Sequence, residues 1–324
     1  MAECAGDIID SNQMKGCLGV IDIQLPHELK KKAEEELQEK EEWRDRDIAA
    51  LRDLVSEDTE LNSRLDDEFL LRFLRARKFD YDCSFQMVQQ YYWTRAQNRH
   101  LFDGLRPSAY QRVFERDLQL VLPQRDHNGC RIFIFRPGAW DPSTCSMDDI
   151  FCTNVLCLEH VAREQATQVC GVVAIQDFTG FGFHHMRHFT TEHIRRMISI
   201  LQGSFPLRFK GFHFVFEPKI FYWAFAAVKP FLSKKLADRL FFHGSNLKSL
   251  HAHFSRAILP RELGGSAPSY CSADLLQQLL RDEQYFVEHN RHGYGVSAAG
   301  VTDAAASSRA RFYPGTFCMQ TGDD

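Results

Sequence analysis

The chain has 324 residues, of which 44% are hydrophobic and 25% are charged, and its formal net charge is −4. This length accommodates two domains, or one large core with a helical annex. A net negative charge argues against a general nucleic-acid-binding protein, which usually carries a basic domain, so we expect no nucleic-acid partner. Any basic site in this chain must therefore be local.

The N-terminus and the cysteines indicate a cytoplasmic protein. The chain has no basic start followed by an apolar core and no Asn-x-Ser/Thr acceptor, so secretion is unsupported. The longest uncharged apolar run, Ile220 to Val228, is far shorter than the roughly 18 residues that span a bilayer. Ten cysteines without a repeated CxxC pair predict reduced, mostly buried thiols and no zinc ligand set.

The first part of the chain is predicted to be helical. Residues 1 to 25 carry no sustained hydrophobic period, and we expect them to be disordered. A charged amphipathic helical stretch runs from His27 to Val55, and shorter helices are expected from Asp66 to Arg77 and from Cys83 to Asn98. Together these elements predict an N-terminal helical domain over residues 26–105, which closes at a tract that contains glycine and proline.

After residue 105 the pattern changes to short apolar runs rich in β-branched and aromatic residues. Three such runs predict strands, at residues 131–136, 171–178 and 211–217. Helices are expected between them: Ser146 and Asp149 have the spacing of a capping box, and residues 191–202 precede a glycine. The alternation of strands and helices predicts an α/β domain with a mainly parallel sheet over residues 106–270.

Two segments remain at the C-terminal end. We expect a C-terminal helix over residues 271–293. The last residues, 294–324, are rich in Ala, Ser and Gly and have no periodicity, so they predict a flexible tail.

No catalytic or cofactor motif is present. The sequence contains no GxGxxG, GxxxxGK[ST] or GxSxG, so we expect neither an enzyme nor a bound cofactor. Histidines at 184, 185, 188 and 193 raise the question of a metal, because His184 and His188 could share a helical face. No cysteine or carboxylate pair completes a ligand set, and we therefore predict no metal and a solvated or capping histidine cluster.

Phenylalanine is unusually frequent, with 27 copies against 4 Trp and 9 Tyr. A bulky apolar ring without a polar handle suits either a thick core or the lining of an apolar cavity. Composition leaves both interpretations open.

A basic segment surrounds the most apolar stretch of the chain. Residues 205–239 hold seven cationic and two anionic side chains, a local charge of +5, and the uncharged run Ile220–Val228 lies among them. A helix that is apolar all round must be buried or must meet something apolar. It is either a core helix or a lid over a cavity, whose outer face enters a lipid interface while the cations meet anionic headgroups.

Several motifs that occur in a fixed order resemble a known family. They are residues 67–80 (DEFLLRFLRARKFD), 140–142 (WDP), 203–214 (GSFPLRFKGFHF), 229–232 (KPFL), 243–244 (HG) and 258–265 (ILPRELGG). Over about residues 27–270 the chain is similar to the CRAL-TRIO lipid-transfer family, which includes tocopherol and retinaldehyde carriers and the clavesins. The resemblance implies an N-terminal all-helical CRAL-TRIO domain, then an α/β lipid-binding domain with a mainly parallel sheet as its floor and a helical gate.

The resemblance also implies site residues. The gate corresponds to residues 218–232, with a pocket closed by Phe221, Phe225 and Val228. Tocopherol-transferring members hold a phosphoinositide headgroup with basic residues, and the matching positions are Arg77, Arg208, Lys210, Lys235 and Arg239. The implied pocket residues are Phe151, Asn154, Val155, Leu158, Val172, Ala174, Gln176, Phe205, Leu207, Phe209 and Phe212. For each pocket residue, ordinary core packing is an open alternative to ligand contact.

The function implied is a non-enzymatic carrier of one hydrophobic lipid, such as a retinoid or a tocopherol-like molecule. Asn154 and Gln176 bring polar groups to an otherwise apolar wall, which predicts a ligand with a polar end that needs a hydrogen bond. We expect reversible association with intracellular membranes that contain phosphoinositide. The alternative is a phosphoinositide-responsive adaptor that senses lipid without transferring it and recruits a protein partner through the N-terminal helices.

Overall fold

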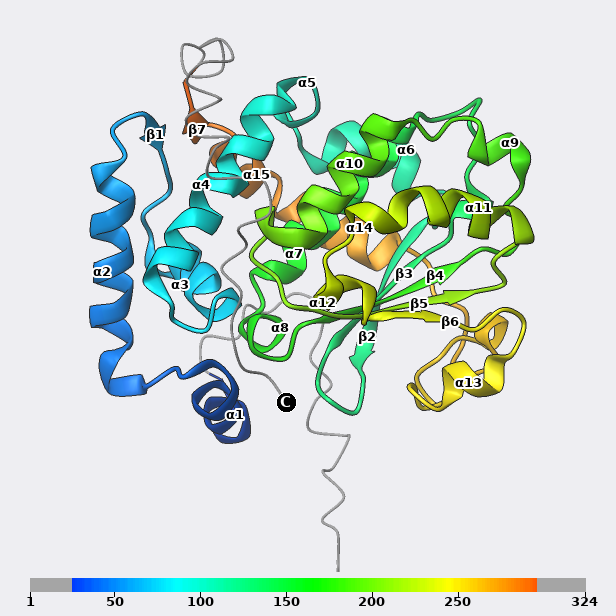
Figure 1. The fold of residues 1–324 in the computed structure, drawn as a ribbon, viewed down its shortest axis with the longest axis horizontal. Helices are drawn as coiled ribbons and strands as arrows, with labels where there is room; N and C mark the ends of the chain where they lie inside the picture. The colour runs from blue at the N-terminus through cyan, green and yellow to red at the C-terminus, as the bar shows by residue number, and fades with distance from the viewer. Residues whose placement is uncertain (1–24, 296–324) are drawn as a thin grey trace, which may run out of the picture.

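A central sheet and a group of N-terminal helices make up the molecule, which the computed structural model describes over residues 25–295 (Figure 1). The sheet has the order β2–β3–β4–β5–β6, with β2 Gln119–Arg125, β3 Arg131–Phe135, β4 Val172–Asp177, β5 Phe209–Val215 and β6 Leu240–Phe242. Strands β3 to β6 are parallel, and β2 pairs antiparallel with β3 at the edge. The predicted α/β class with a mainly parallel sheet is confirmed, and β2 and β6 are additional strands.

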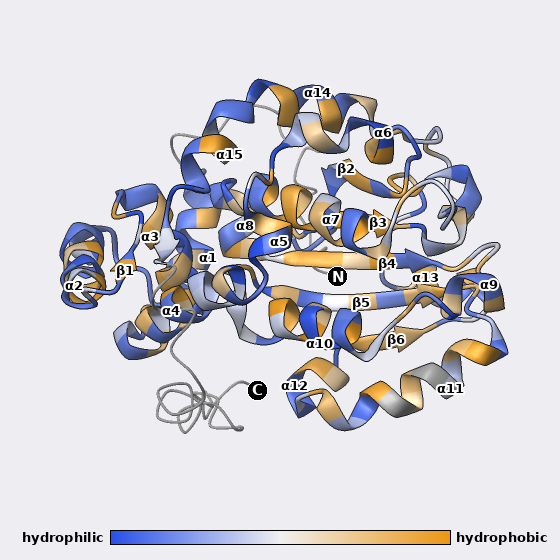
Figure 2. Cartoon of the chain, turned by 90° about the horizontal axis from the view of Figure 1, so that it is seen from above, coloured by the Kyte–Doolittle hydropathy of each residue, from blue (hydrophilic) through white to orange (hydrophobic). Residues whose placement is uncertain are grey.

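Side chains alternate along the strands and enter two separate apolar cores. Phe133, Ala174 and Phe212 are neighbours in register and pack on the side of α7 Met147–Ala162. The residues between them, such as Ile132 and Val173, pack on the other side with α13 Leu247–His251 and the chain that follows it. Figure 2 shows the hydrophobic strand β4 between helices whose outer surfaces are largely hydrophilic.

Strand β5 begins with a β-bulge. Val172 pairs with Phe209 but Val173 pairs with Gly211, so Lys210 is the extra residue. A bulge shifts the alternation by one position, which explains why Phe209 and Phe212 both face α7 although they are an odd number of positions apart. A Cβ on Gly171, whose φ is +93°, would lie 2.4 Å from the carbonyl oxygen of Arg208, so this close approach of β4 to the start of β5 requires glycine.

The N-terminal helices lie together at one side of the sheet (Figure 1) and comprise α1 His27–Leu37, α2 Arg44–Glu57, α3 Asp67–Ala76 and α4 Tyr81–Gln97. The helical stretch predicted from His27 to Val55 is interrupted. Gln38 has a left-handed backbone (φ 64°) that ends α1, and a short 3-10 helix, η1 Glu41–Trp43, precedes α2. Asp66 and Asp80 cap α3 and α4 by accepting backbone N–H groups.

The C-terminal segment returns to the N-terminal helices. The single helix predicted over residues 271–293 is instead two helices, α14 Ala273–Arg281 and α15 Glu283–His289. They are separated at Asp282, whose carboxylate accepts a hydrogen bond at 2.5 Å from Arg163, the residue directly after α7. Strand β7 Gly293–Tyr294 then pairs antiparallel with β1 Leu61–Asn62.

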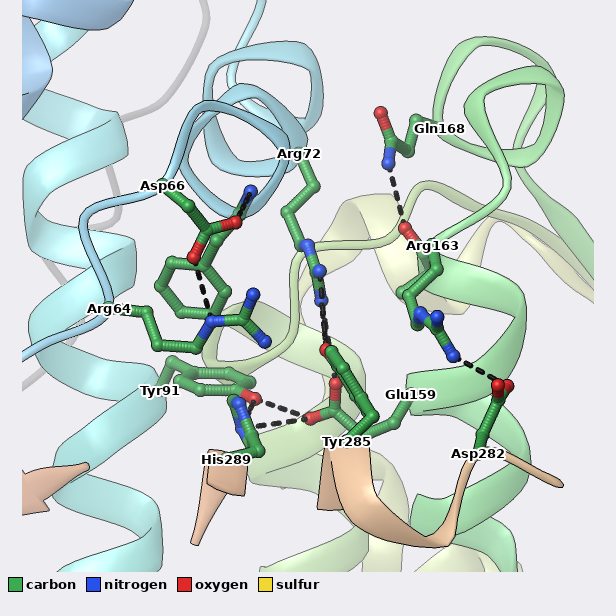
Figure 3. A network of polar contacts seen from close by, with 12 residues as sticks. Arg64, Asp66, Arg72, Tyr91, Glu159, Arg163, Gln168, Asp282, Tyr285 and His289 are labelled. Atoms are coloured by element: carbon green, nitrogen blue, oxygen red, sulfur yellow. Dashed lines mark hydrogen bonds and ion pairs between the residues drawn. The ribbon is translucent and has the colours of Figure 1, made fainter. Parts of the chain in front are cut away.

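A buried polar network joins these three parts of the chain (Figure 3). Glu159 of α7 is 1% exposed; its carboxylate accepts hydrogen bonds from Tyr91 and Arg95 of α4 and lies 3.6 Å from Arg72 of α3. Nε2 of His289, on α15, lies 2.5 Å from the Tyr91 hydroxyl. The network therefore fixes α3, α4 and α15 to the helix that packs on the sheet.

The remaining elements are short. They are α5 Arg99–Phe102, η2 Pro107–Tyr110, α6 Gln111–Phe114, η3 Pro137–Ala139, α8 Gln165–Cys170, α9 Phe183–Met186, α10 Thr191–Ser199, the π-helical turn η4 Ile200–Ser204, α11 Lys219–Val228, η5 Lys229–Phe231, α12 Lys234–Ala237 and η6 Arg261–Leu263. In the part of the chain that the structure describes, no helix is long and apolar enough to cross a bilayer.

The predicted disordered N-terminus and flexible tail lie outside the described residues, apart from Leu25, Tyr294 and Gly295 at their ends. Leu25 is buried and Tyr294 is in β7, so the predicted boundaries are too wide by these residues. Six described cysteines are free thiols, in agreement with the expectation of reduced thiols at these positions.

Candidate functional site

A cavity of about 170 Å³ lies among α7, the sheet and the α10–η4 segment. Its lining consists of Phe133, Phe135, Met147, Ile150, Phe151, Asn154, Val155, Leu158, Val172, Ala174, Gln176, Phe189, His193, Met197, Ile200, Leu201, Phe209, Phe212 and Phe214. Only Asn154, Gln176 and His193 are polar. A concave, apolar space with a few convergent polar groups is suited to an apolar molecule with one polar end.

Nine of the eleven predicted pocket residues line this cavity. They are Phe151, Asn154, Val155, Leu158, Val172, Ala174, Gln176, Phe209 and Phe212. The other two, Phe205 and Leu207, are buried in the core outside the lining; the Phe205 ring lies 6.0 Å from that of Tyr91, toward the N-terminal helices. Ligand contact by the nine residues stays a prediction.

Sequence reasoning missed the wall formed by α10 and η4 and part of the sheet. His193, Met197, Ile200 and Leu201 are spaced four, three and one apart, which is the pattern of one helical face, and this signal was available in the sequence. Phe133 and Phe135 likewise alternate with Ile132 and Ile134 along β3, but the sequence does not tell which of the two sets meets the cavity.

The predicted gate residues do not line the cavity. The ring centroid of Phe221, on α11, lies 4.7 Å from that of Phe178 and 5.4 Å from that of Phe214. Phe214 in turn lines the cavity. Phe225 packs 5.1 Å from Phe242 of β6, and Val228 is half-buried. Phe221 therefore meets the cavity only through Phe214, and closure of the pocket by Phe221, Phe225 and Val228 stays a prediction.

A carboxylate holds the first turn of α11. Oε1 of the buried Glu217 accepts a hydrogen bond from the Tyr222 hydroxyl at 2.8 Å and another from the backbone N–H of Gly244 at 2.9 Å. The hydrogen bond to Glu217 raises the pKa of Tyr222. Phe216, directly before Glu217, has a positive φ of 56°, so the chain turns sharply as it leaves β5.

The outer side of α11 carries exposed aromatic rings. Trp223 is 81% exposed and Phe183 of α9 is 71% exposed, and Tyr222 and Phe231 are about half exposed. Helices α9 and α11 lie at the same end of the molecule in Figures 1 and 2. Exposed lysines, at 219, 229 and 234, accompany the rings. We call these four aromatic residues the outer aromatic face; apolar groups of this size exposed together indicate a surface that meets another apolar phase.

The structure brings three of the five predicted phosphoinositide residues together at the start of β5. Arg208 and Lys210 both lie against the carboxylate of Glu36, and Arg239 donates a hydrogen bond to the carbonyl of Phe209 at 2.6 Å. Burial lowers the pKa of Lys210, and the positive charge of Arg208 lowers it further. We call Arg208, Lys210 and Arg239 the basic cluster.

The other two basic residues are on nearby elements. Lys235 is in α12, four residues before Arg239, and Arg77 follows the last residue of α3. Their part in headgroup binding stays a prediction.

Two of the four histidines at 184, 185, 188 and 193 cap helices. Nδ1 of His185 accepts the N–H of Gly182 at 3.0 Å, which leaves its Nε2 to donate to the Trp140 carbonyl at 2.8 Å. Nδ1 of His193 accepts the N–H of Thr190. Across residues 25–295, no group of three or more His, Cys, Asp or Glu side chains is arranged to hold a metal ion.

Comparison with known proteins identifies similar sequences along most of the chain. The model of the CRAL/TRIO domain matches residues 115–265, and that of the CRAL/TRIO N-terminal domain matches residues 27–90. The mouse alpha-tocopherol transfer protein-like protein is 44% identical over 82% of this chain and 77% of its own length. Mouse clavesin-2 is 35% identical over 86% of each chain, and Xenopus laevis clavesin-1 is 36% identical over 76% of this chain and 75% of its own length.

Proposed function

Because this chain belongs to the CRAL-TRIO family of lipid-binding and lipid-transfer proteins, we propose that it holds one hydrophobic lipid in the cavity between α7 and the sheet and exchanges it at phosphoinositide-containing membranes. The observation that carries the proposal is the cavity itself, whose lining is apolar except at three side chains. The exchange is a non-enzymatic binding reaction at a membrane surface.

Energetics favour exchange at a membrane over release into water. Burying about ten methylene groups is worth about 8 kcal/mol, at about 0.8 kcal/mol each, so desorption into water is slow. Transfer from bilayer to cavity replaces one apolar environment with another and is nearly balanced. A protein that docks on a membrane and opens there therefore needs no hydrolysis step to move its lipid.

The polar groups in the lining favour a lipid with a hydrogen-bonding end. Oδ1 of Asn154 is buried and has no hydrogen-bond partner, and an unsatisfied buried acceptor costs about 1–3 kcal/mol. A hydroxyl group on the lipid would donate a hydrogen bond to this oxygen, and Gln176 and His193 are polar neighbours in the same lining. Retinoids and tocopherol-like molecules, with a long apolar part and one polar end, have this chemistry.

The outer aromatic face and the basic residues are the proposed docking surface. Aromatic rings on α9 and α11 would enter the lipid interface, and exposed lysines beside them would meet anionic headgroups. Each well-placed lysine or arginine contributes about 1 kcal/mol at an anionic membrane. If α11 moves away from the cavity in an open state, a bilayer that contacts α11 would bind this open state more tightly than the closed one and would therefore favour opening.

Replacing Tyr222 with Phe should accelerate lipid exchange about fivefold, because the hydrogen bond that ties α11 to Glu217 contributes about 1 kcal/mol to the closed state. Stopped-flow transfer of a fluorescent lipid between vesicles measures the rate. Tyr270→Phe, which removes a hydroxyl that binds Gln124 outside the cavity lining, is the matched control. Equal rates for Tyr222→Phe and the wild type would show that this contact does not limit opening.

The test of the proposed function is transfer of a fluorescent hydrophobic lipid between donor and acceptor vesicles, with and without phosphoinositide. We expect phosphoinositide to stimulate transfer by the wild type. The double variant Lys235→Ala, Arg239→Ala should lose most of the stimulation, since two basic contacts are worth about 2 kcal/mol, roughly thirtyfold in binding.

The control for this experiment is Lys248→Ala with Arg281→Ala, which removes the same charge from the exposed sides of α13 and α14. It should transfer lipid like the wild type. If the wild type holds a lipid but exchanges none, the carrier proposal fails, and the adaptor that recruits a protein partner through the N-terminal helices becomes the better interpretation.

A further inference from the structure

An acidic side chain from the first helix lies within the basic cluster. Oε2 of Glu36, in the last turn of α1, is 3.0 Å from Nη2 of Arg208 and 3.6 Å from Nζ of Lys210. A single carboxylate oxygen thus bridges two cations, as one oxygen of a phosphate group would. Glu36 and Arg208 are 172 residues apart in the chain.

The electrostatics show that this carboxylate is a counter-ion for the cluster. Burial raises the pKa of Glu36, but the hydrogen bond from Arg208 and the positive charges of Lys210, Arg208 and Lys32 together lower it below its ordinary value. Glu36 therefore carries its negative charge at neutral pH. On the other side of the contact, Glu36 offsets part of the depression of the Lys210 pKa that burial and Arg208 cause.

The apolar contact of helix α1 with the rest of the molecule is small, and Lys32 adds a hydrogen bond to the carbonyl of Asn128. Its buried residues Ala33 and Leu37, with Leu25 before them, pack on Val169 and Cys170 of α8 in a cluster that is separate from the main core. Displacing such a helix costs less than disturbing α3 or α4, whose rings belong to the main core. The carboxylate of Glu36 is therefore on a helix whose apolar contact is small, although the buried ion pair of Glu39 with Arg75 anchors the chain directly after it.

We propose that Glu36 is an internal competitor for the anionic headgroup, whose carboxylate occupies the place of a phosphate between Arg208 and Lys210 and must leave before a phosphoinositide binds. This inference rests on the proposed function, because it assumes that the basic cluster binds the headgroup. It assigns a selective role to Glu36. A lipid with one negative charge gains little by replacing a carboxylate of equal charge, whereas a phosphate monoester, with a charge of about −1.5 to −2, gains more.

The experiment measures binding of the full chain to sedimented vesicles of phosphatidylcholine alone, with phosphatidylserine, and with phosphatidylinositol bisphosphate. Glu36→Gln should bind the bisphosphate vesicles about fivefold more tightly, the change that about 1 kcal/mol of charge interaction produces. Its affinity for phosphatidylserine vesicles should rise by at least the same factor relative to the wild type. The ratio of its affinities for phosphoinositide and phosphatidylserine vesicles should therefore be no larger than that of the wild type. Glu35→Gln, on the exposed side of the same helix and paired only with Lys31 among the described contacts, is the matched control and should bind like the wild type.

The outcomes separate this inference from the proposed function. If Arg208→Ala weakens phosphoinositide binding but Glu36→Gln binds no more tightly than Glu35→Gln, the competitor role is overturned and the basic site stands. Weaker binding by Glu36→Gln would also overturn it, since Glu36 would then be organising the site. If the wild type shows no preference for phosphoinositide and Arg208→Ala changes nothing, the proposed docking site itself fails.

A second measurement does not depend on affinity. Hydrogen exchange of the backbone amides in residues 27–37 should become faster when the wild type binds bisphosphate vesicles, because α1 loses its contact with β5. In Glu36→Gln those amides should exchange faster already without vesicles. Unchanged protection of α1 on binding would contradict displacement of the helix.

Discussion

Replacing Glu159 with Gln is expected to lower the free energy of unfolding by about 3–5 kcal/mol, because it leaves buried cations without their counter-charge. Glu159 is the carboxylate that Arg72 and Arg95 share, and the side chains of Glu159 and Arg72 are 1% and 2% exposed. Gln keeps the size of the side chain and removes its charge. Arg95 and Arg72 would then be held in the interior with only neutral hydrogen-bond acceptors such as the Tyr285 hydroxyl.

Urea unfolding followed by circular dichroism measures this loss, and Glu35→Gln, which is largely exposed, should change stability by less than about 0.5 kcal/mol. If the free energy of unfolding falls by less than about 1 kcal/mol in Glu159→Gln, water must reach and solvate the two arginines, and the prediction is wrong. The effect should also reach the cavity, since Glu159 lies on the same helix as Phe151, Asn154, Val155 and Leu158. Loosening α7 would therefore weaken lipid binding together with stability.

Replacing Ala174 with Phe is expected to reduce lipid affinity by more than a hundredfold while the protein stays folded. Ala174 is at the middle of the floor formed by β4, and its side chain lines the cavity. A phenyl ring there would occupy the space of about four ligand methylene groups, which corresponds to about 3 kcal/mol. The cavity of about 170 Å³ accepts the ring, so the overpacking cost of a filled core is avoided.

The affinity is measured by titration with a fluorescent retinoid or tocopherol analogue, and stability by thermal unfolding. Ala109→Phe, at an exposed position, is the control and should bind like the wild type. Retention of wild-type affinity by folded Ala174→Phe would show that the lipid is bound elsewhere. A thermal midpoint equal to or above that of the wild type, with binding lost, would locate the lipid at the sheet.

Local patterns were sufficient for most of the secondary structure. The runs that became β3, β4 and β5 are rich in β-branched or aromatic residues, and Ser146 and Asp149 form the capping box that their spacing predicts. Strand β2 was missed because Pro123 and polar residues interrupt its apolar run, and β6 because it has only three residues. The end of α1 was missed because a left-handed Gln38 has no sequence signal comparable to glycine.

The pocket shows how far resemblance extends and where it stops. Nine predicted positions line the cavity, since the sheet and α7 follow the family pattern. The bulge at Lys210 places Phe209 and Phe212 on the same face of the sheet. Phe205 instead packs against Tyr91, and Phe221 of α11, outside the cavity lining, packs against Phe214. These differences depend on which surface each element meets, and a segment's own residues do not encode that surface.

The sequence by itself therefore determined the class of the fold, the parallel sheet, the apolar character of the future cavity and the location of the basic segment. Only the tertiary structure decided which ion pairs form: Glu36 pairs with Arg208 and Lys210, and Glu159 pairs with two arginines of other helices. It also decided that Trp223 of α11 is exposed. The physical reason is range. Periodicity and capping act over a few neighbouring residues, whereas these ion pairs and this exposure arise between segments that only the folded chain brings together.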